Sequence, residues 1–365
     1  MDRSCALSSS WVSGEAEGMR YKLLGKTGLR VSELCLGAMM FGYPRESGGV
    51  LPEESGAIVK RFAEAGGNFI DTANHYAGGE SERIVGDLIR PDRDRWVLAT
   101  KYTLTSDPDD PNAGGSHRKS LRRAIDASLD RLGTDYIDLY WVHIWDAFTP
   151  VEEVISALDD LVRSGKVLYV GISDTPAWMV ARAVSLAEER GLTSFRALQV
   201  PYSLVERTVE RELLPVARAL DLAVTGWAPL GGGLLTGRYG SDRERPTDGR
   251  LAGRTLSESK LAIADALNSV AEARGSSASQ VALAWVRAQQ RRAVTIPIVG
   301  VRTEAQLVDN LAATEMDLDP DELARLDEVS RVTLGFPGDF GGASAAYGNT
   351  FDLIDDHRGT IEALV

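Results

Sequence analysis

Short apolar runs alternate with amphipathic helical stretches along most of this 365-residue chain. A parallel strand can rejoin its neighbour only through a long crossover, usually a helix, so this alternation is typical of a parallel α/β sheet. Eight apolar runs match the eight strands of a (β/α)8 TIM barrel, which we predict as the fold. The predicted strands cover residues 33–38, 68–73, 95–101, 136–143, 167–173, 197–200, 222–228 and 293–300.

The remaining elements follow from helical periodicity and turn residues. The run RYKLLGKTGLRVS is expected to form an N-terminal β-hairpin with turns at Gly25 and Gly28. The Gly- and Arg-rich segment 231–254 is expected to be a long, mobile loop of the kind that serves as a lid on the face where the strands end. Helices are predicted at 53–65, 80–89, 117–132, 151–164, 176–190, 208–220, 277–291 and 303–312, with two extra ones at 257–274 and 319–330.

One domain accommodates these elements. With 44% hydrophobic residues, the chain can bury one large core, and α/β barrels commonly reach this length as single domains. We predict a disordered N-terminal extension at 1–18, a barrel domain at 19–331 and a C-terminal tail at 332–365. Met19 is an alternative start of translation.

Charge and cysteine content restrict the partners. The formal net charge of −13 argues against nucleic acid and anionic membranes, so an anionic ligand would need a local basic site. The first eighteen residues lack the pattern of a signal peptide, and no run approaches a membrane span. Cys5 and Cys35 are the two cysteines, too few for a disulfide framework or a Cys-rich metal site. We expect a cytoplasmic protein that binds no metal. The sequence is compatible with oligomerisation.

Four polar residues follow the second, third and fourth predicted strands. Asp71 and Tyr76 lie in FIDTANHYAGGESE, Lys101 closes RWVLATK, and His143 closes YIDLYWVH. The C-terminal ends of barrel strands carry the chemistry in this fold. Singly, each residue has another explanation: a turn cap, a loop ion pair or a core histidine. Jointly, we favour a catalytic role.

These four side chains suit the reduction of a carbonyl group. The carbonyl oxygen needs a proton, and a tyrosine with an ordinary pKa of about 10 can donate one when an ammonium stabilises the phenolate. Lys101 would supply the ammonium and Asp71 would hold it in place. His143 would donate a hydrogen bond to the substrate oxygen and orient the carbonyl.

The motifs resemble the aldo-keto reductase superfamily from about Tyr21 to Val329. Segments similar to the family occur in order: LGAMMFG, FIDTANHYAGGESE, TKYT, RLGTDYIDLYWVH, SGKVLYVGIS, YSLVERTVERELLP and GWAPLGGGLLTGRY. GISDTPAW and VERTVERELLPVA look closest to the aryl-alcohol-dehydrogenase-like branch, near the potassium-channel β subunits. The resemblance implies a catalytic tetrad of Asp71, Tyr76, Lys101 and His143, with Lys101 lowering the pKa of Tyr76.

The resemblance also implies NADP(H), bound without the Rossmann glycine fingerprint that the first strand here lacks. Ser173 and Gln199 would bond the carboxamide, and Trp227 would stack on the nicotinamide. Asp174 replaces a common Asn and, when ionised, cannot donate a hydrogen bond. The full set of expected contacts is Met39, Ser173, Asp174, Gln199, Trp227, Ala228, Pro229, Leu230, Gly231, Gly232, Arg238, Gly300, Arg302, Gln306 and Asn310.

The phosphate contacts favour NADPH over NADH. Glycines of the loop PLGGGLLTGR would let backbone amides approach the pyrophosphate, and Arg302 would pair with the 2′-phosphate. Arg250 or Arg254 could also reach this phosphate. Other readings stay open: Trp227 as a barrel-core residue, and Arg302 as a surface charge beside an N-cap at Thr303.

The expected function is NADPH-dependent reduction of a small-molecule aldehyde or ketone. Apolar side chains are expected to line the pocket, namely Met39, Met40, Trp145, Trp227, Phe336 and Phe340. The alternatives are a reductase of a sugar intermediate in secondary metabolism, an NADPH-binding redox sensor or accessory subunit with slow turnover, and an unrelated barrel enzyme that acts on phosphorylated substrates.

Overall fold

Eight parallel strands close into a barrel in the computed structural model, which describes residues 18–340 and 348–355. Around the barrel the order is β10, β3, β4, β5, β6, β7, β8, β9, so neighbours in sequence are neighbours in the sheet. The prediction of a (β/α)8 barrel is confirmed. The strands are β3 (Cys35–Gly37), β4 (Phe69–Asp71), β5 (Val97–Tyr102), β6 (Ile137–Val142), β7 (Val167–Ser173), β8 (Ala197–Pro201), β9 (Ala223–Trp227) and β10 (Thr295–Val299).

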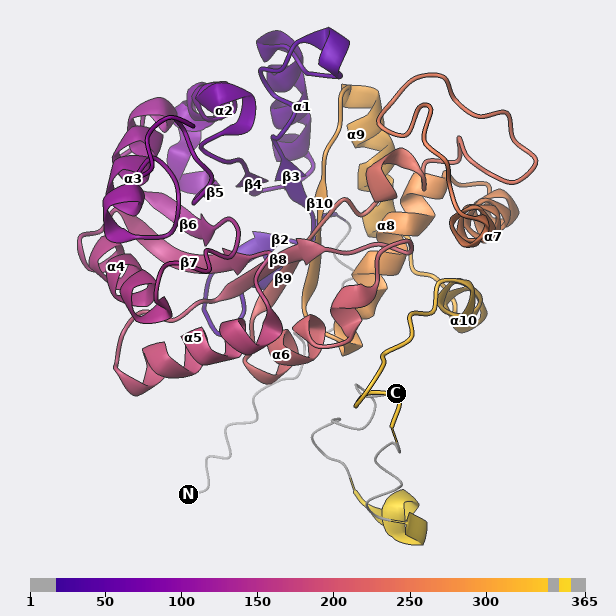
Figure 1. Ribbon diagram of the computed structural model, residues 1–365. Helices are drawn as coiled ribbons and strands as arrows, with labels where there is room; N and C mark the ends of the chain where they lie inside the picture. The colour runs from indigo at the N-terminus through magenta and orange to yellow at the C-terminus, as the bar shows by residue number, and fades with distance from the viewer. Residues whose placement is uncertain (1–17, 341–347, 356–365) are drawn as a thin grey trace, which may run out of the picture.

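Helices form a ring around the strands (Figure 1). The two helices that break the alternation, α7 (Glu258–Arg274) and α10 (Pro320–Val329), lie outside α8 in the same view. The ring consists of α1 (Pro52–Glu64), α2 (Glu80–Ile89), α3 (Arg118–Leu132), α4 (Val151–Arg163), α5 (Ala177–Glu189), α6 (Leu213–Ala219), α8 (Ala278–Ala288) and α9 (Glu304–Leu311).

One helix is shorter than predicted. Instead of a helix over 208–220, the chain forms a 3-10 turn, η4 (Thr208–Glu210), and then α6. Pro215 lies in the first turn of α6, where a missing N–H is tolerated. Deeper inside a helix its ring would clash with the carbonyl four residues earlier, so α6 cannot begin at 208.

The N-terminal hairpin closes one end of the barrel. Its strands β1 (Tyr21–Leu23) and β2 (Arg30–Ser32) pair antiparallel, as expected. Leu24 and Val31 are fully buried in a cluster with residues of the barrel interior. Gly25 has φ +52, and a Cβ there would lie 2.4 Å from the Arg196 carbonyl oxygen, so only glycine fits this turn.

At the other end lie the long loops. After a short 3-10 turn, η5 (Gly231–Gly233), the described chain has no helix or strand until α7 begins at Glu258. This loop projects beside α9 in Figure 1. Arg250 Nη2 lies 3.0 Å from Met40 Sδ, which joins the loop to the segment after β3.

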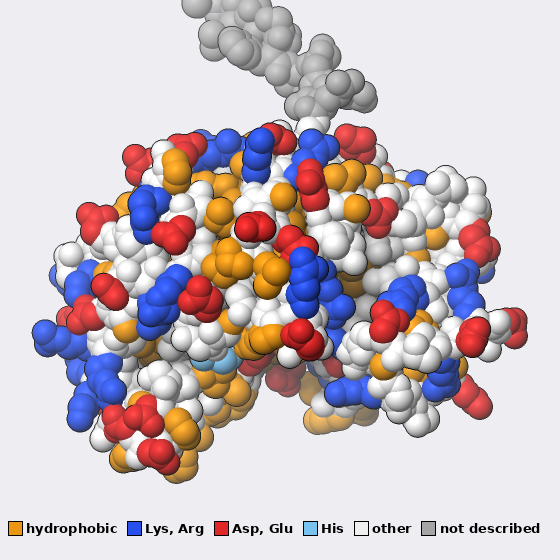
Figure 2. All heavy atoms as spheres, turned by 90° about the horizontal axis from the view of Figure 1, so that it is seen from above, with side chains coloured by type: hydrophobic (Ala, Val, Ile, Leu, Met, Phe, Trp, Pro, Cys, Tyr) orange, Lys and Arg blue, Asp and Glu red, His pale blue; other side chains and the backbone are white. Residues whose placement is uncertain are grey.

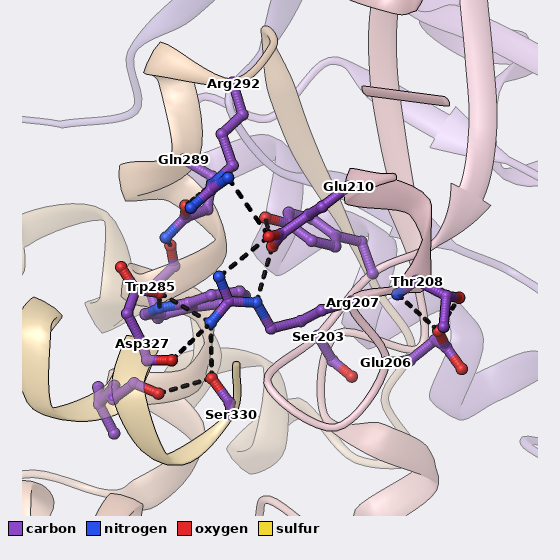
Figure 3. Close-up of polar contacts among 12 residues, drawn as sticks. Ser203, Glu206, Arg207, Thr208, Glu210, Trp285, Gln289, Arg292, Asp327 and Ser330 are labelled. Carbon is purple, nitrogen blue, oxygen red and sulfur yellow. Dashed lines mark hydrogen bonds and ion pairs between the residues drawn. The ribbon is translucent and has the colours of Figure 1, made fainter. Parts of the chain in front are cut away.

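A buried network fastens α10 to the barrel domain (Figure 3). The guanidinium of Arg207 donates to both carboxylate oxygens of Glu210, at 2.7 and 3.0 Å. It also donates to Asp327 Oδ1 at 2.9 Å and to Ser330 Oγ at 2.7 Å, and it lies over the Trp285 ring. Arg207 therefore links η4, α8 and α10.

The tail after α10 does not contribute to the barrel mouth within the described residues. Its chain runs outside the ring of helices (Figure 1). Phe336 and Phe340 pack on each other at 5.8 Å and are 85% and 77% exposed, so the expectation that they line the substrate pocket is not supported. Cys5, the predicted extension before Gly18, and the tail segments 341–347 and 356–365 lie outside the described residues.

Candidate active site

Three of the four predicted catalytic residues meet at one ammonium group. Lys101 Nζ forms an ion pair with the Asp71 carboxylate, donates to the Thr72 carbonyl at 2.8 Å, and lies 3.2 Å from the Tyr76 hydroxyl. The side chain of Lys101 is fully buried. The predicted charge pair and its contact with the phenol are thus present.

Strand register explains this meeting. In the parallel pair of β4 and β5, Asp71 lies opposite Ala99. Side chains two residues apart on a strand point to the same face, so Lys101 lies one step beyond Ala99 toward the mouth. Tyr76 begins the 3-10 turn η2 (Tyr76–Gly79), which follows β4 and returns the phenol over the strand ends.

Burial and charge act in opposite directions on the pKa values of the quartet. Burial raises the pKa of Tyr76, and the nearby Lys101 ammonium opposes this without reversing it. Lys101 thus acts on the Tyr76 pKa in the expected direction, and burial outweighs it. Burial would lower the pKa of Lys101, but Asp71 and Tyr76 together raise it, so the ammonium stays protonated.

His143 completes the quartet as a neutral imidazole. Burial, assisted by the positive charge of Lys101, lowers its pKa to about 2. Its ring lies 6.0 Å from the Tyr76 ring, edge to face. The His143 backbone N–H donates to the Tyr102 carbonyl at 3.2 Å, which fixes the residue at the end of β6.

A second histidine, which sequence reasoning missed, lies beside this pair. The ring centroid of His75 is 4.9 Å from that of Tyr76 and 5.1 Å from that of His143. Burial lowers the pKa of His75 as well. Its position directly before Tyr76 in the sequence was the available signal.

Ser173 and Gln199, the expected carboxamide ligands, lie side by side at the ends of β7 and β8. Both are buried. Gln199 Nε2 donates to Asp71 Oδ1 at 3.2 Å, so this amide also touches the carboxylate that holds Lys101.

Asp174 and Trp227 contact each other. Asp174 Oδ1 accepts a hydrogen bond from Trp227 Nε1 at 3.2 Å. Burial raises the pKa of Asp174, and this hydrogen bond opposes the rise. Trp227 is 39% exposed, which excludes the alternative of a barrel-core tryptophan. The Asp174 carboxylate supplies the acceptor that the Trp227 indole N–H requires.

Tryptophans form one wall near His143. Trp145 follows β6, and its backbone N–H points to the Asp174 carbonyl at 3.4 Å. Trp178, near the start of α5, contacts Trp145 edge to face at 6.5 Å and is 61% exposed. Trp178 was not predicted, although it ends the quoted motif GISDTPAW.

Arginines gather where β9 and β10 end. Arg238 pairs with Asp248. That pairing lowers the pKa of Asp248, and Arg302 adds to the lowering. Burial lowers the pKa of Arg250, and Arg302 contributes to this too. Arg302 thus lies within electrostatic reach of both Asp248 and Arg250, and of the two candidate loop arginines Arg250 is the one placed beside it.

The molecule is hollowed at one edge (Figure 2). Figure 2 shows a recess between two lobes, with a histidine visible at its rim and Lys or Arg side chains beside it. The protein backbone is open to close approach by a ligand at Gly232 and Gly300, where an added Cβ would meet nothing within 4 Å. At Gly231 the same atom would lie 2.6 Å from Val205.

The remaining expected contacts have mixed positions. Met39 and Gln306 are exposed, whereas Asn310 is buried. Gln306 Oε1 accepts from the Arg302 backbone N–H at 2.9 Å, and Thr303 caps α9, as its alternative reading proposed. Ala228, Pro229 and Leu230 connect β9 to η5, and Ala228 has φ +52.

Within residues 18–340 and 348–355, no group of three or more His, Cys, Asp or Glu is placed to hold a metal ion. Over the same residues, no helix combines the length and the apolar character needed to cross a membrane.

Known proteins share this sequence pattern. The model of the aldo/keto reductase family, described as "Aldo/keto reductase family", matches residues 33–331. Norsolorinic acid reductase stcV of Emericella nidulans is 41% identical, over 85% of this chain and 81% of that protein. Norsolorinic acid reductase A of Aspergillus parasiticus is 39% identical, over 86% and 81%. A putative aryl-alcohol dehydrogenase, AAD14 of Saccharomyces cerevisiae, is 35% identical, over 87% and 88%.

Proposed function

This chain belongs to the aldo/keto reductase family as an oxidoreductase acting on carbonyl groups, and on that premise we propose that it reduces an aldehyde or ketone with a hydride from bound NADPH. In this proposal Tyr76 gives the proton to the carbonyl oxygen. Lys101, Asp71 and His143 assist it.

One observation carries the proposal: a single buried ammonium touches both a carboxylate and a phenol. When the Tyr76 hydroxyl gives up its proton, the phenolate left behind lies 3.2 Å from Lys101 Nζ. Asp71 and the Thr72 carbonyl keep that ammonium in place, so no reorganisation is needed as charge develops. The neutral His143 can donate to the carbonyl oxygen without a competing positive charge.

The residues present fit NADPH. Ser173 and Gln199 would hold its carboxamide, and the indole face of Trp227 would lie against the nicotinamide. The open glycines at 232 and 300 would admit the pyrophosphate. Arg302 and Arg250 would pair with the 2′-phosphate, a charge that NADH lacks.

Aromatic aldehydes and ketones are the substrate class that we propose. The exposed Trp178 and its partner Trp145, two residues after His143, offer flat apolar faces, and such faces favour ring substrates. Relatives are named for norsolorinic acid and for aryl alcohols, which agrees with this class.

The test is NADPH oxidation with 4-nitrobenzaldehyde, followed by absorbance. Tyr76→Phe removes the proton donor and should lower kcat by about 10²–10⁴-fold, the range for a general acid, with NADPH affinity retained. Tyr136→Phe is the matched control, since the Tyr136 hydroxyl bonds the exposed Asp94 away from the site; its kcat should not change.

Other outcomes identify the alternatives. Tight NADPH binding without turnover on a broad carbonyl panel would indicate a redox sensor or accessory subunit. Absence of NADPH binding would point to a barrel enzyme for phosphorylated substrates. Faster turnover with aldoses than with any aromatic aldehyde would favour a sugar intermediate.

A further inference from the structure

We propose that His75 determines substrate specificity: its Nε2–H donates a hydrogen bond to a second oxygen of the substrate, on the ring carbon next to the one that bears the carbonyl. The enzyme would then prefer ortho-oxygenated aromatic carbonyl compounds. This inference rests on the proposed function.

The position of His75 is the first argument. Its ring lies close to both groups that would meet the carbonyl oxygen: the ring centroids are 4.9 Å from that of Tyr76 and 5.1 Å from that of His143. The planes of the two imidazoles are tilted by 50° to each other and are not stacked. A substrate oxygen held between Tyr76 and His143 would therefore lie near His75 as well.

Hydrogen bonding gives the second argument. Nδ1 of His75 and Nδ1 of His143 are both buried and have no partner within the described chain. A neutral imidazole carries its proton on one nitrogen only. A proton on the buried Nδ1 would be an N–H without an acceptor, which is costly. Both rings should therefore carry the proton on Nε2, the nitrogen that is not enclosed.

Two N–H donors are consequently free beside Tyr76. The proposed reaction uses the donor of His143 for the carbonyl oxygen and leaves that of His75 without a partner. No described side chain accepts a hydrogen bond from His75, so its N–H is free to exchange a water acceptor for a ligand oxygen. An oxygen ortho to the carbonyl is close enough to the first oxygen to be reached by the neighbouring ring.

The experiment compares two substrates of similar shape. 2-Methoxybenzaldehyde carries the oxygen, and 2-ethylbenzaldehyde replaces it with a methylene group. The kcat/KM for 2-methoxybenzaldehyde divided by that for 2-ethylbenzaldehyde should fall about fivefold in His75→Phe. This is the loss expected for one neutral hydrogen bond. The value for 2-ethylbenzaldehyde reports any general effect of the replacement on turnover, and the ratio cancels that effect.

Two further variants complete the test. His75→Gln keeps an N–H donor and should retain part of the wild-type ratio. If His75→Phe folds poorly, this variant provides the comparison with wild type. His117→Asn is the control, since His117 caps α3 and asparagine is also a good cap; its ratio should match the wild type.

The outcomes separate this inference from the proposed function. Reduction of both aldehydes with the same ratio in wild type, His75→Phe and His75→Gln would overturn the inference and leave His75 as an inert wall. A wild-type protein that oxidises NADPH with neither aldehyde, nor with 4-nitrobenzaldehyde, would remove the proposed function and this inference with it.

Discussion

Burial acts on three neighbouring side chains with three different results. It leaves His143 a neutral imidazole, keeps Tyr76 a protonated phenol, and fails to neutralise Lys101 because Asp71 and Tyr76 oppose it. These are the protonation states from which the proposed proton transfer would start. One low-dielectric environment thus prepares a donor, an acid and a stabilising charge.

The neutral state of His143 makes stability depend on pH. The folded pKa is about 2, whereas an unfolded histidine has a pKa of about 6.5. Between these values the unfolded chain binds one more proton, so the free energy of unfolding falls as the pH falls below 6.5. At pH 5 this residue alone should cost about 2 kcal/mol relative to neutral pH.

Urea denaturation of wild type and His143→Asn at pH 7 and pH 5 measures this effect. Asparagine does not titrate, so the variant should lose about 2 kcal/mol less than wild type between the two pH values. Equal losses would mean that His143 can be protonated in the folded protein. All other titrating groups are common to both proteins.

The quartet was predictable because each member follows an apolar run that can only be a buried strand. The contacts of His75 and Trp178 were not predictable, because they depend on side-chain directions in the loop after β4 and in the first turn of α5. The net shift of the Tyr76 pKa was not predictable for a related reason. The sequence identifies the ammonium beside the phenol, but not how deeply the phenol is buried.

Elements differ in how far periodicity determines them. All eight barrel strands were located from apolar runs, since a strand covered on both faces needs nearly continuous apolar side chains. The start of α6 was misplaced because helical spacing alone ignores Pro215. The loop between η5 and α7 has no periodicity, so only its structure distinguishes Arg250 from Arg254.

Arg302 tests the role of the loop after β10. Arg302→Ala should raise the Kd for NADPH about 10–100-fold, the value of one or two charge-assisted hydrogen bonds, and should raise that for NADH by less than about threefold. Fluorescence titration with both cofactors measures the two constants. Arg325→Ala, on exposed α10, removes the same charge elsewhere and should affect neither. Equal weakening for both cofactors would contradict the assignment.

At the scale of the molecule, contacts between distant segments hold the barrel domain together, and the number of strands does not predict them. The closed barrel follows from eight strands in sequential order. The network around Arg207 joins residues 120 positions apart, and no local pattern predicts such a pairing. Its buried guanidinium is satisfied by two carboxylates, a hydroxyl and an aromatic face.

Arg207→Met should lower the free energy of unfolding by about 3–5 kcal/mol, because Glu210 remains buried without its main partner. Arg182→Met is the matched control. Its 2.6 Å pair with Glu152 is as short, but the side chains are 56% and 36% exposed, so the loss should stay below about 1 kcal/mol. Denaturant titration of both variants gives the comparison. Similar losses would show that the Arg207 network contributes no more than a surface pair.

The hairpin that closes one end of the barrel also imposes an order of events. With Leu24 and Val31 packed into that end, the substrate and the cofactor must both pass through the loop-lined mouth. Whichever lies deeper has to arrive first and depart last. Under the proposed function the nicotinamide, held at the strand ends by Ser173 and Gln199, lies deeper than a carbonyl resting on Trp178. Turnover should therefore be sequential, with NADPH as the leading reactant and NADP as the final product to leave.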